Sequence, residues 1–107
     1  MGTTKTQIFT SEQNELASIF KVLSNPARIA IIEYISQQQS CICNDIVAEI
    51  GLAQPTISQH LKELKSIGLL KGEIDGKTVC YCLDVIKWKQ IQSQLNKFFN
   101  TTQANCC

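Results

Sequence analysis

The segment of residues 45–82 places its predicted elements in an order that few folds share. A short helix is predicted over residues 45–50, a tight turn over residues 51–53, and a second helix that opens at Gln54. The dipeptide Asp75-Gly76 then predicts the two-residue turn of a small hairpin. Helix, turn, helix and hairpin in this order predict a helix-turn-helix followed by a wing.

The second of these helices separates apolar from polar side chains. Ile57, Leu61 and Leu64 recur at spacings of four and three and predict a buried stripe. Amide and hydroxyl groups on the opposite face can bind base edges in the major groove, and lysines can bind phosphate. Any solvated helix shows such side chains, but the preceding turn and the following wing favour DNA binding. The residues predicted to contact DNA are Gln54, Thr56, Ser58, Gln59, His60 and Lys62 of the helix and Lys77 of the wing.

Two capping patterns predict where the first two helices begin. Thr10, with Gln13 three residues later, forms a capping pattern for a first helix. Asn25-Pro26 provides a cap and a first-turn proline for a helix over residues 27–36. A last helix is predicted from about Asp84. We therefore expect a mainly α fold with a small β-hairpin, a dimeric winged helix-turn-helix over residues 10–100, between a flexible tail (1–9) and a C-terminal tail (101–107).

The last helix carries an apolar stripe of Trp88, Ile91, Leu95 and Phe98. Spacings of three, four and three are typical of a helix–helix seam. Packing within the subunit would also explain the stripe. Because a terminal helix has few other partners, and a 107-residue chain buries only a modest core, we expect a homodimer interface here.

Charge and hydropathy limit the partners of the chain. The formal net charge of +1 is small for a nucleic-acid binder, so we expect salt-sensitive binding that depends on geometry more than on a strong field. No apolar run is long enough for a membrane span, and the first residues lack an apolar signal-peptide core. We therefore expect a cytoplasmic protein without a membrane partner.

Six cysteines occur as three close pairs, and in a reducing compartment we do not expect a standing disulfide framework. Cys41 and Cys43 are predicted at the start of the third helix, where the macrodipole favours the thiolate. They are interpreted as ligands for a soft ion, against the alternative of small buried hydrophobic residues. Cys80 and Cys82 are interpreted as strand packing. The tail pair, Cys106 and Cys107, is interpreted as a ligating or redox-sensing pair that can supply a third sulfur, or as an unselected tail.

These motifs resemble those of the ArsR/SmtB family of bacterial repressors. The resemblance rests on residues 20–28 (FKVLSNPAR), 54–62 (QPTISQHLK), 68–70 (GLL) and the wing around Gly76 and Tyr81. It implies a repressor whose inducer ion binds a Cys-x-Cys-Asp box, here matched by Cys41-Ile42-Cys43. This chain departs from the box because Asn44 is inserted before Asp45, which is a rotation of about 100° on a helix.

The resemblance also bears on which ion binds. It implies trivalent arsenic or antimony as the inducer, with cadmium or lead as the alternative, and no permanent cofactor. The zinc site of related repressors needs histidines on the last helix, and this helix has none after Asp84.

The function expected from the sequence is therefore a DNA-binding repressor that releases its operator when such an ion binds cysteine thiolates. A redox-sensing repressor of the same fold is the first alternative. A metal-buffering or protein-interaction domain without DNA binding is disfavoured by the polar face of the second helix. A thiol enzyme is not expected, because no histidine is placed beside a cysteine and no Cys-x-x-Cys occurs.

Overall fold

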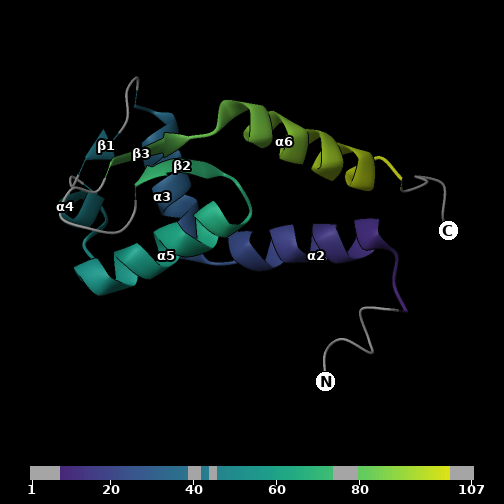
Figure 1. Cartoon of the computed structure of the whole chain (residues 1–107), viewed down its shortest axis with the longest axis horizontal. Helices are drawn as coiled ribbons and strands as arrows, with labels where there is room; N and C mark the ends of the chain where they lie inside the picture. The colour runs from purple at the N-terminus through teal and green to yellow at the C-terminus, as the bar shows by residue number, and fades with distance from the viewer. Residues whose placement is uncertain (1–7, 39–41, 44–45, 74–79, 102–107) are drawn as a thin grey trace, which may run out of the picture.

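The computed structural model describes residues 8–38, 42–43, 46–73 and 80–101. Within these ranges α3, α4, α5 and a small sheet form one lobe, and α2 and α6 extend from it side by side (Figure 1). The elements in chain order are α2 (Ser11–Leu23), α3 (Pro26–Ser36), β1 (Ile42–Cys43), α4 (Ile46–Ile50), α5 (Gln54–Ser66), β2 (Leu70–Glu73), β3 (Cys80–Leu83) and α6 (Val85–Phe99). This is a winged helix-turn-helix, as predicted.

Side-chain caps set three helix starts. All three starts were predicted, and the caps at Thr10 and Asn25 were predicted with them. The Thr10 hydroxyl accepts a hydrogen bond from the Gln13 amide at 3.0 Å, and the Gln13 side chain accepts one from the Thr10 amide, which completes a capping box before α2. The Asn25 side chain accepts from the Ala27 amide at 2.9 Å and begins α3. The Asp84 carboxylate accepts from the Lys87 amide at 3.1 Å and begins α6.

The sheet contains three strands in the order β1-β3-β2, and both pairings are antiparallel. In the wing, Leu70 pairs with Leu83 and Glu73 pairs with Cys80. The predicted turn at Asp75-Gly76 lies outside the described residues. The sequence did not predict β1, because two residues are too few to show the alternation of a strand.

The core lies between the sheet, α3 and the inner face of α5. Ile57, Leu61 and Leu64 of α5 are each no more than 1% exposed, which confirms the predicted stripe. They belong to one cluster with Ile31 of α3 and Tyr81 of β3. Each such fully buried apolar side chain stabilises the fold by about 1.5–3 kcal/mol. None of the helices in the described ranges is long and apolar enough to cross a membrane.

The apolar stripe of α6 is divided between core and surface. Ile91 is 1% exposed and belongs to the core within the chain. Trp88 and Leu95 are half-buried and pack against it. Phe98 is 46% exposed, and its ring contacts that of Phe20 on α2 with centroids 5.7 Å apart. Part of the stripe therefore holds α6 to its own subunit.

Gly72 lets the two wing strands approach closely. Its φ is 119°, and a Cβ at this position would overlap the Cys80 carbonyl oxygen and lie 2.8 Å from the Tyr81 Cα. We expect Gly72→Ala to lower the free energy of unfolding by at least about 3 kcal/mol, because both strain and a backbone clash oppose it. Urea denaturation measures the loss.

Gly51 provides the matched control for this prediction. Its φ is 83°, but a Cβ there would meet nothing within 4 Å. Gly51→Ala should therefore cost only the left-handed strain, about 1–2 kcal/mol. Equal losses in the two variants would contradict the close approach at Gly72.

Candidate nucleic-acid interface and thiol sites

Helix α5 presents a polar face opposite its buried stripe. Pro55 lies in its first turn, where the missing amide hydrogen is tolerated. The side chains predicted to contact DNA on this helix are exposed at Gln54, Thr56, Gln59 and Lys62 and half-buried at Ser58 and His60. The fold thus leaves most of the predicted contact residues accessible. Lys77, the predicted wing contact, lies outside the described residues.

Two polar contacts organise this surface. The Gln59 amide nitrogen donates to a Glu63 carboxylate oxygen at 3.3 Å, one helical turn further along α5. The Lys65 ammonium donates to the carbonyl of Gly72 at 2.7 Å and so ties the end of α5 to β2. Lys65 therefore positions the wing relative to α5, a role that sequence spacing alone did not indicate.

His60 is anchored from a neighbouring helix. Its Nδ1 accepts a hydrogen bond from the Arg28 Nε of α3 at 3.1 Å, and an Arg28 Nη1 donates to the Val22 carbonyl at 3.1 Å. The acceptor role of Nδ1 leaves the proton of a neutral ring on Nε2. Nε2 is then the atom with which the predicted contact of His60 to DNA would be made. This role of Arg28 could not be predicted from the sequence, because its partner is 32 residues away.

We expect Arg28→Leu to weaken both stability and DNA binding. The change removes two hydrogen bonds of a charged group, which are worth about 1.5–3 kcal/mol each. It also removes the hydrogen bond that holds the His60 ring, so α5 is less firmly oriented against α3. Urea denaturation gives the loss of stability, and titration of DNA at a temperature where the variant remains folded gives the loss of affinity. Lys21→Leu, on the exposed face of α2, is the control; a variant at Arg28 that matches it in both measurements would contradict the anchoring role.

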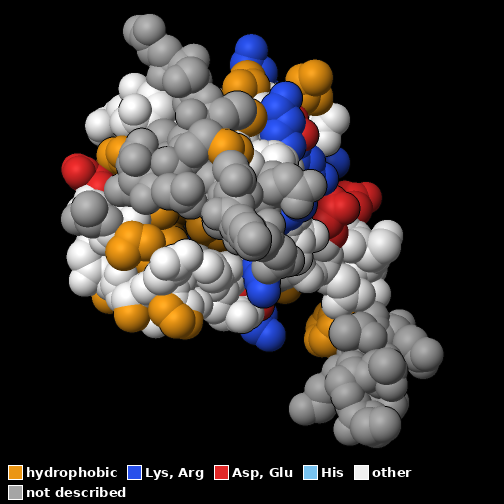
Figure 2. Space-filling view, turned by 60° about the vertical axis from the view of Figure 1, so that its left-hand side comes forward, with side chains coloured by type: hydrophobic (Ala, Val, Ile, Leu, Met, Phe, Trp, Pro, Cys, Tyr) orange, Lys and Arg blue, Asp and Glu red, His pale blue; other side chains and the backbone are white. Residues whose placement is uncertain are grey.

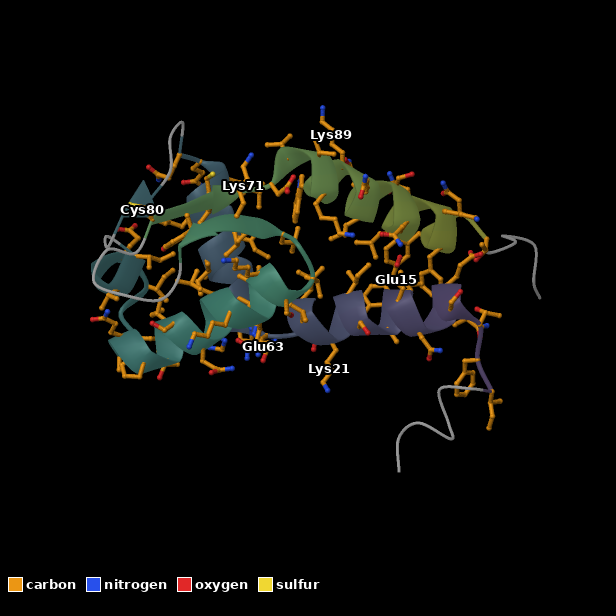
Figure 3. All side chains as sticks on the ribbon, in the orientation of Figure 1. Glu15, Lys21, Glu63, Lys71, Cys80 and Lys89 are labelled. Carbon is orange, nitrogen blue, oxygen red and sulfur yellow. The ribbon has the colours of Figure 1, made fainter. Side chains whose placement is uncertain are left out.

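Basic and acidic side chains lie beside one another on the molecular surface. On the face shown in Figure 2, Lys and Arg side chains form a broken band with Asp and Glu side chains beside it. Figure 3 shows Glu63 of α5 and Lys71 of β2 on neighbouring elements. With a formal net charge of only +1, the chain carries no large excess of positive charge. Affinity for a polyanion therefore depends on where individual lysines lie.

The thiol positions differ from expectation in one respect. Cys43 lies in β1, paired with β3, and α4 begins only at Ile46. The prediction that Cys43 lies at a helix start was therefore wrong, and the macrodipole argument does not apply to it. Its register is that of a strand residue, opposite Cys80. The other predicted ligands, Cys41, Cys106 and Cys107, lie outside the described residues.

Cys80 and Cys82 lie two residues apart on β3 in different chemical states. Cys80 is half-buried and engaged in a disulfide bond. Cys82 is a half-buried thiol. Figure 3 shows Cys80 where β3 runs beside β1. Among the side chains that the structure describes, no three His, Cys, Asp or Glu residues form a metal-binding group.

A groove opens along α6 beside the end of α2. Its volume is about 240 Å³ and its lining is mostly apolar. Leu23 of α2 and the α6 residues Trp88, Ile91, Gln92, Leu95, Asn96 and Phe99 form its wall. Glu15 of α2 points toward α6 and accepts a hydrogen bond from Gln94, so the two helices are also joined by a polar contact (Figure 3). The groove is a mostly apolar surface on the two helices that extend from the lobe.

Comparison with known proteins identifies the class. Residues 25–71 match the family described as "Bacterial regulatory protein, arsR family". The chain is 33% identical over 92 residues to the arsenical resistance operon repressor of Staphylococcus aureus, with 86% of each chain covered. The chain therefore belongs to the ArsR family of bacterial regulatory proteins, which are transcriptional regulators and not enzymes.

Two other relatives show how the similarity is distributed. The HTH-type transcriptional repressor SmtB of Mycobacterium tuberculosis is 38% identical over 65 residues, which cover 61% of this chain and 47% of SmtB. The chain thus spans about half the length of that relative. A cadmium resistance regulatory protein CadC homolog of Staphylococcus aureus is 36% identical over 78 residues, which cover 72% of this chain and 64% of that protein.

Proposed function

We propose that this chain is a homodimeric transcriptional repressor that binds operator DNA and releases it when a thiophilic ion binds its cysteine thiolates. The observation that carries the DNA-binding half of the proposal is the accessible polar face of α5, next to a wing that Lys65 ties in place. In a dimer, two such helices enter successive major grooves about 34–36 Å apart. The wing, including Lys77, then approaches flanking phosphate.

The apolar groove along α6 supports the proposal that the chain forms a homodimer. It joins apolar side chains of α2 and α6 that their own chain leaves partly exposed, among them Leu95 and Phe99. A second copy of the same surface would cover them in a two-fold symmetric seam. Because each reading helix contacts only half of an operator, pairing the two multiplies the affinity.

The inducer half of the proposal rests on thiol chemistry and on relatives. The names of two relatives refer to arsenical and to cadmium resistance. Trivalent arsenic and antimony are soft ions that thiolates bind strongly, and cadmium or lead shares this preference. The proposed ligands are Cys41 and Cys43, with Cys106 or Cys107 as a third sulfur. Cys43 lies three residues before the first residue of α4, so an ion bound there can favour the conformation that fits DNA poorly.

One titration tests the whole proposal. The protein is bound to DNA of its own promoter region, and arsenite, antimonite, cadmium, lead, zinc and peroxide are added separately to the reduced complex. We expect saturable binding to this DNA, release by arsenite and antimonite at the lowest concentrations, and little response to zinc. Release by cadmium or lead alone would identify one of these ions as the inducer in place of arsenic and antimony. Absence of binding to any promoter fragment would overturn the repressor function.

A further inference from the structure

The disulfide of Cys80 has few candidate partners. Because Cys82 is a thiol, the partner is one of the four remaining cysteines. One of these four is Cys43, whose Cα lies directly opposite that of Cys80 in the β1–β3 register. Residues directly opposite on antiparallel strands have Cα atoms about 4.5–5.5 Å apart, and their side chains lie on the same face. A disulfide requires Cα atoms within about 7 Å, so the register permits this bond.

We propose that Cys43 and Cys80 form a reversible dithiol–disulfide site that gates the response to the inducer. The inference rests on the proposed function in one respect, that Cys43 is an inducer ligand. A disulfide sulfur is no longer a thiolate and does not bind a soft ion as one. Closing the bond therefore removes Cys43 from the ligand set, and opening it returns both thiols.

The chemistry needs a two-electron oxidant of the peroxide class. One thiolate attacks a peroxide oxygen and becomes a sulfenic acid while the other peroxide oxygen leaves as hydroxide or alkoxide. The second thiol then attacks the sulfenic sulfur, the S–S bond forms and water leaves. The two thiols lose two electrons and two protons, and hydrogen peroxide is reduced to two waters. A reducing thiol reverses the reaction through a mixed disulfide.

The two cysteines lie outside the helix that is proposed to contact DNA. The bond joins β1, which precedes α4, to β3, the returning strand of the wing, and encloses α4, α5 and β2 between its ends. Neither cysteine belongs to α5, whose exposed face is the proposed DNA contact. We therefore expect the oxidised protein to keep its operator affinity and to lose its release by arsenite. Oxidation would hold the repressor on DNA in the presence of the inducer.

Peptide mapping tests the pairing without any assumption about the inducer. Trypsin leaves Cys41 and Cys43 together in the peptide of residues 29–62, Cys80 and Cys82 in that of residues 78–87, and the tail pair in that of residues 98–107. After treatment with hydrogen peroxide, the double variant Cys41→Ser/Cys82→Ser should yield peptides 29–62 and 78–87 joined by one disulfide, because only Cys43 and Cys80 remain in them. A link from 78–87 to 98–107, or no link, would overturn the pairing.

A second experiment tests whether the disulfide controls the response to arsenite. Protein bound to promoter DNA is titrated with arsenite after reduction by a phosphine, and again after peroxide. Wild type and Cys82→Ser should release DNA at low arsenite when reduced and should require at least tenfold more arsenite after oxidation. Cys80→Ser should release DNA equally in both states. Gating that persists in Cys80→Ser, or operator binding that is lost on oxidation, would overturn the gate. If the reduced wild type ignores arsenite, the proposed function fails, while the mapped bond still decides the pairing.

Discussion

Replacing Ser58 and Gln59 together with alanine is expected to weaken operator binding by about thirtyfold or more. Each lost contact to a base edge costs about 1–3 kcal/mol, and the two losses act on one helix. Gln59 is exposed and Ser58 half-buried, and neither belongs to the core, so the variant should remain folded. Fluorescence anisotropy of labelled promoter DNA measures the affinity, and circular dichroism checks the helical content.

The chain offers a matched control on another helix. Gln90 and Ser93 are exposed on α6, on the side opposite the apolar groove. Gln90→Ala with Ser93→Ala removes the same two kinds of side chain and should leave the affinity unchanged. Wild-type affinity in the Ser58/Gln59 variant would show that the polar face of α5 does not contact DNA.

A charge in the α6 groove is expected to separate the proposed dimer. Leu95→Glu would place an unpaired carboxylate in an apolar seam, which costs about 3 kcal/mol or more. Sedimentation should then show monomers at concentrations where the wild type is dimeric, and DNA binding should weaken because two half-sites no longer act together.

Two further variants distinguish loss of the dimer from loss of folding stability. Leu95 packs against the core, whereas Phe99 lines the same groove and is 60% exposed. Phe99→Glu loses ring contacts with Phe20 and Phe98 but no core packing, so it should dissociate the dimer with a smaller loss of stability than Leu95→Glu. Ile86 is 74% exposed on the opposite side of α6, and Ile86→Glu should leave the dimer intact. A Phe99→Glu protein that is folded and dimeric would assign the groove to another role.

Local patterns in the sequence predicted much of this fold. The caps at Thr10, Asn25 and Asp84 mark three helix starts because each satisfies backbone amides within three residues of its own position. The stripe on α5 was predictable because its period matches the helical repeat. Patterns of this kind depend on neighbours along the chain and not on the rest of the fold.

Features that depend on distant residues were not predictable in the same way. Strand β1 contains two residues and exists through its pairing with β3, so the register of Cys43 opposite Cys80 appears only in three dimensions. The contact of Arg28 with His60 joins two helices and has no spacing rule. On α6, periodicity identified an apolar stripe but could not tell that Ile91 belongs to the core while Phe98 remains half exposed.

The most direct measurement is arsenite-induced release of promoter DNA by single cysteine variants in the reduced state. Cys41→Ser and Cys43→Ser should bind the DNA as tightly as wild type, because α5 is unchanged, and should retain it at arsenite concentrations that release the wild type. Cys106→Ser with Cys107→Ser should respond at higher arsenite if the tail supplies a third sulfur, since a two-sulfur site binds more weakly. Cys82→Ser is the control and should release normally. Wild-type release by both Cys41→Ser and Cys43→Ser would contradict the account.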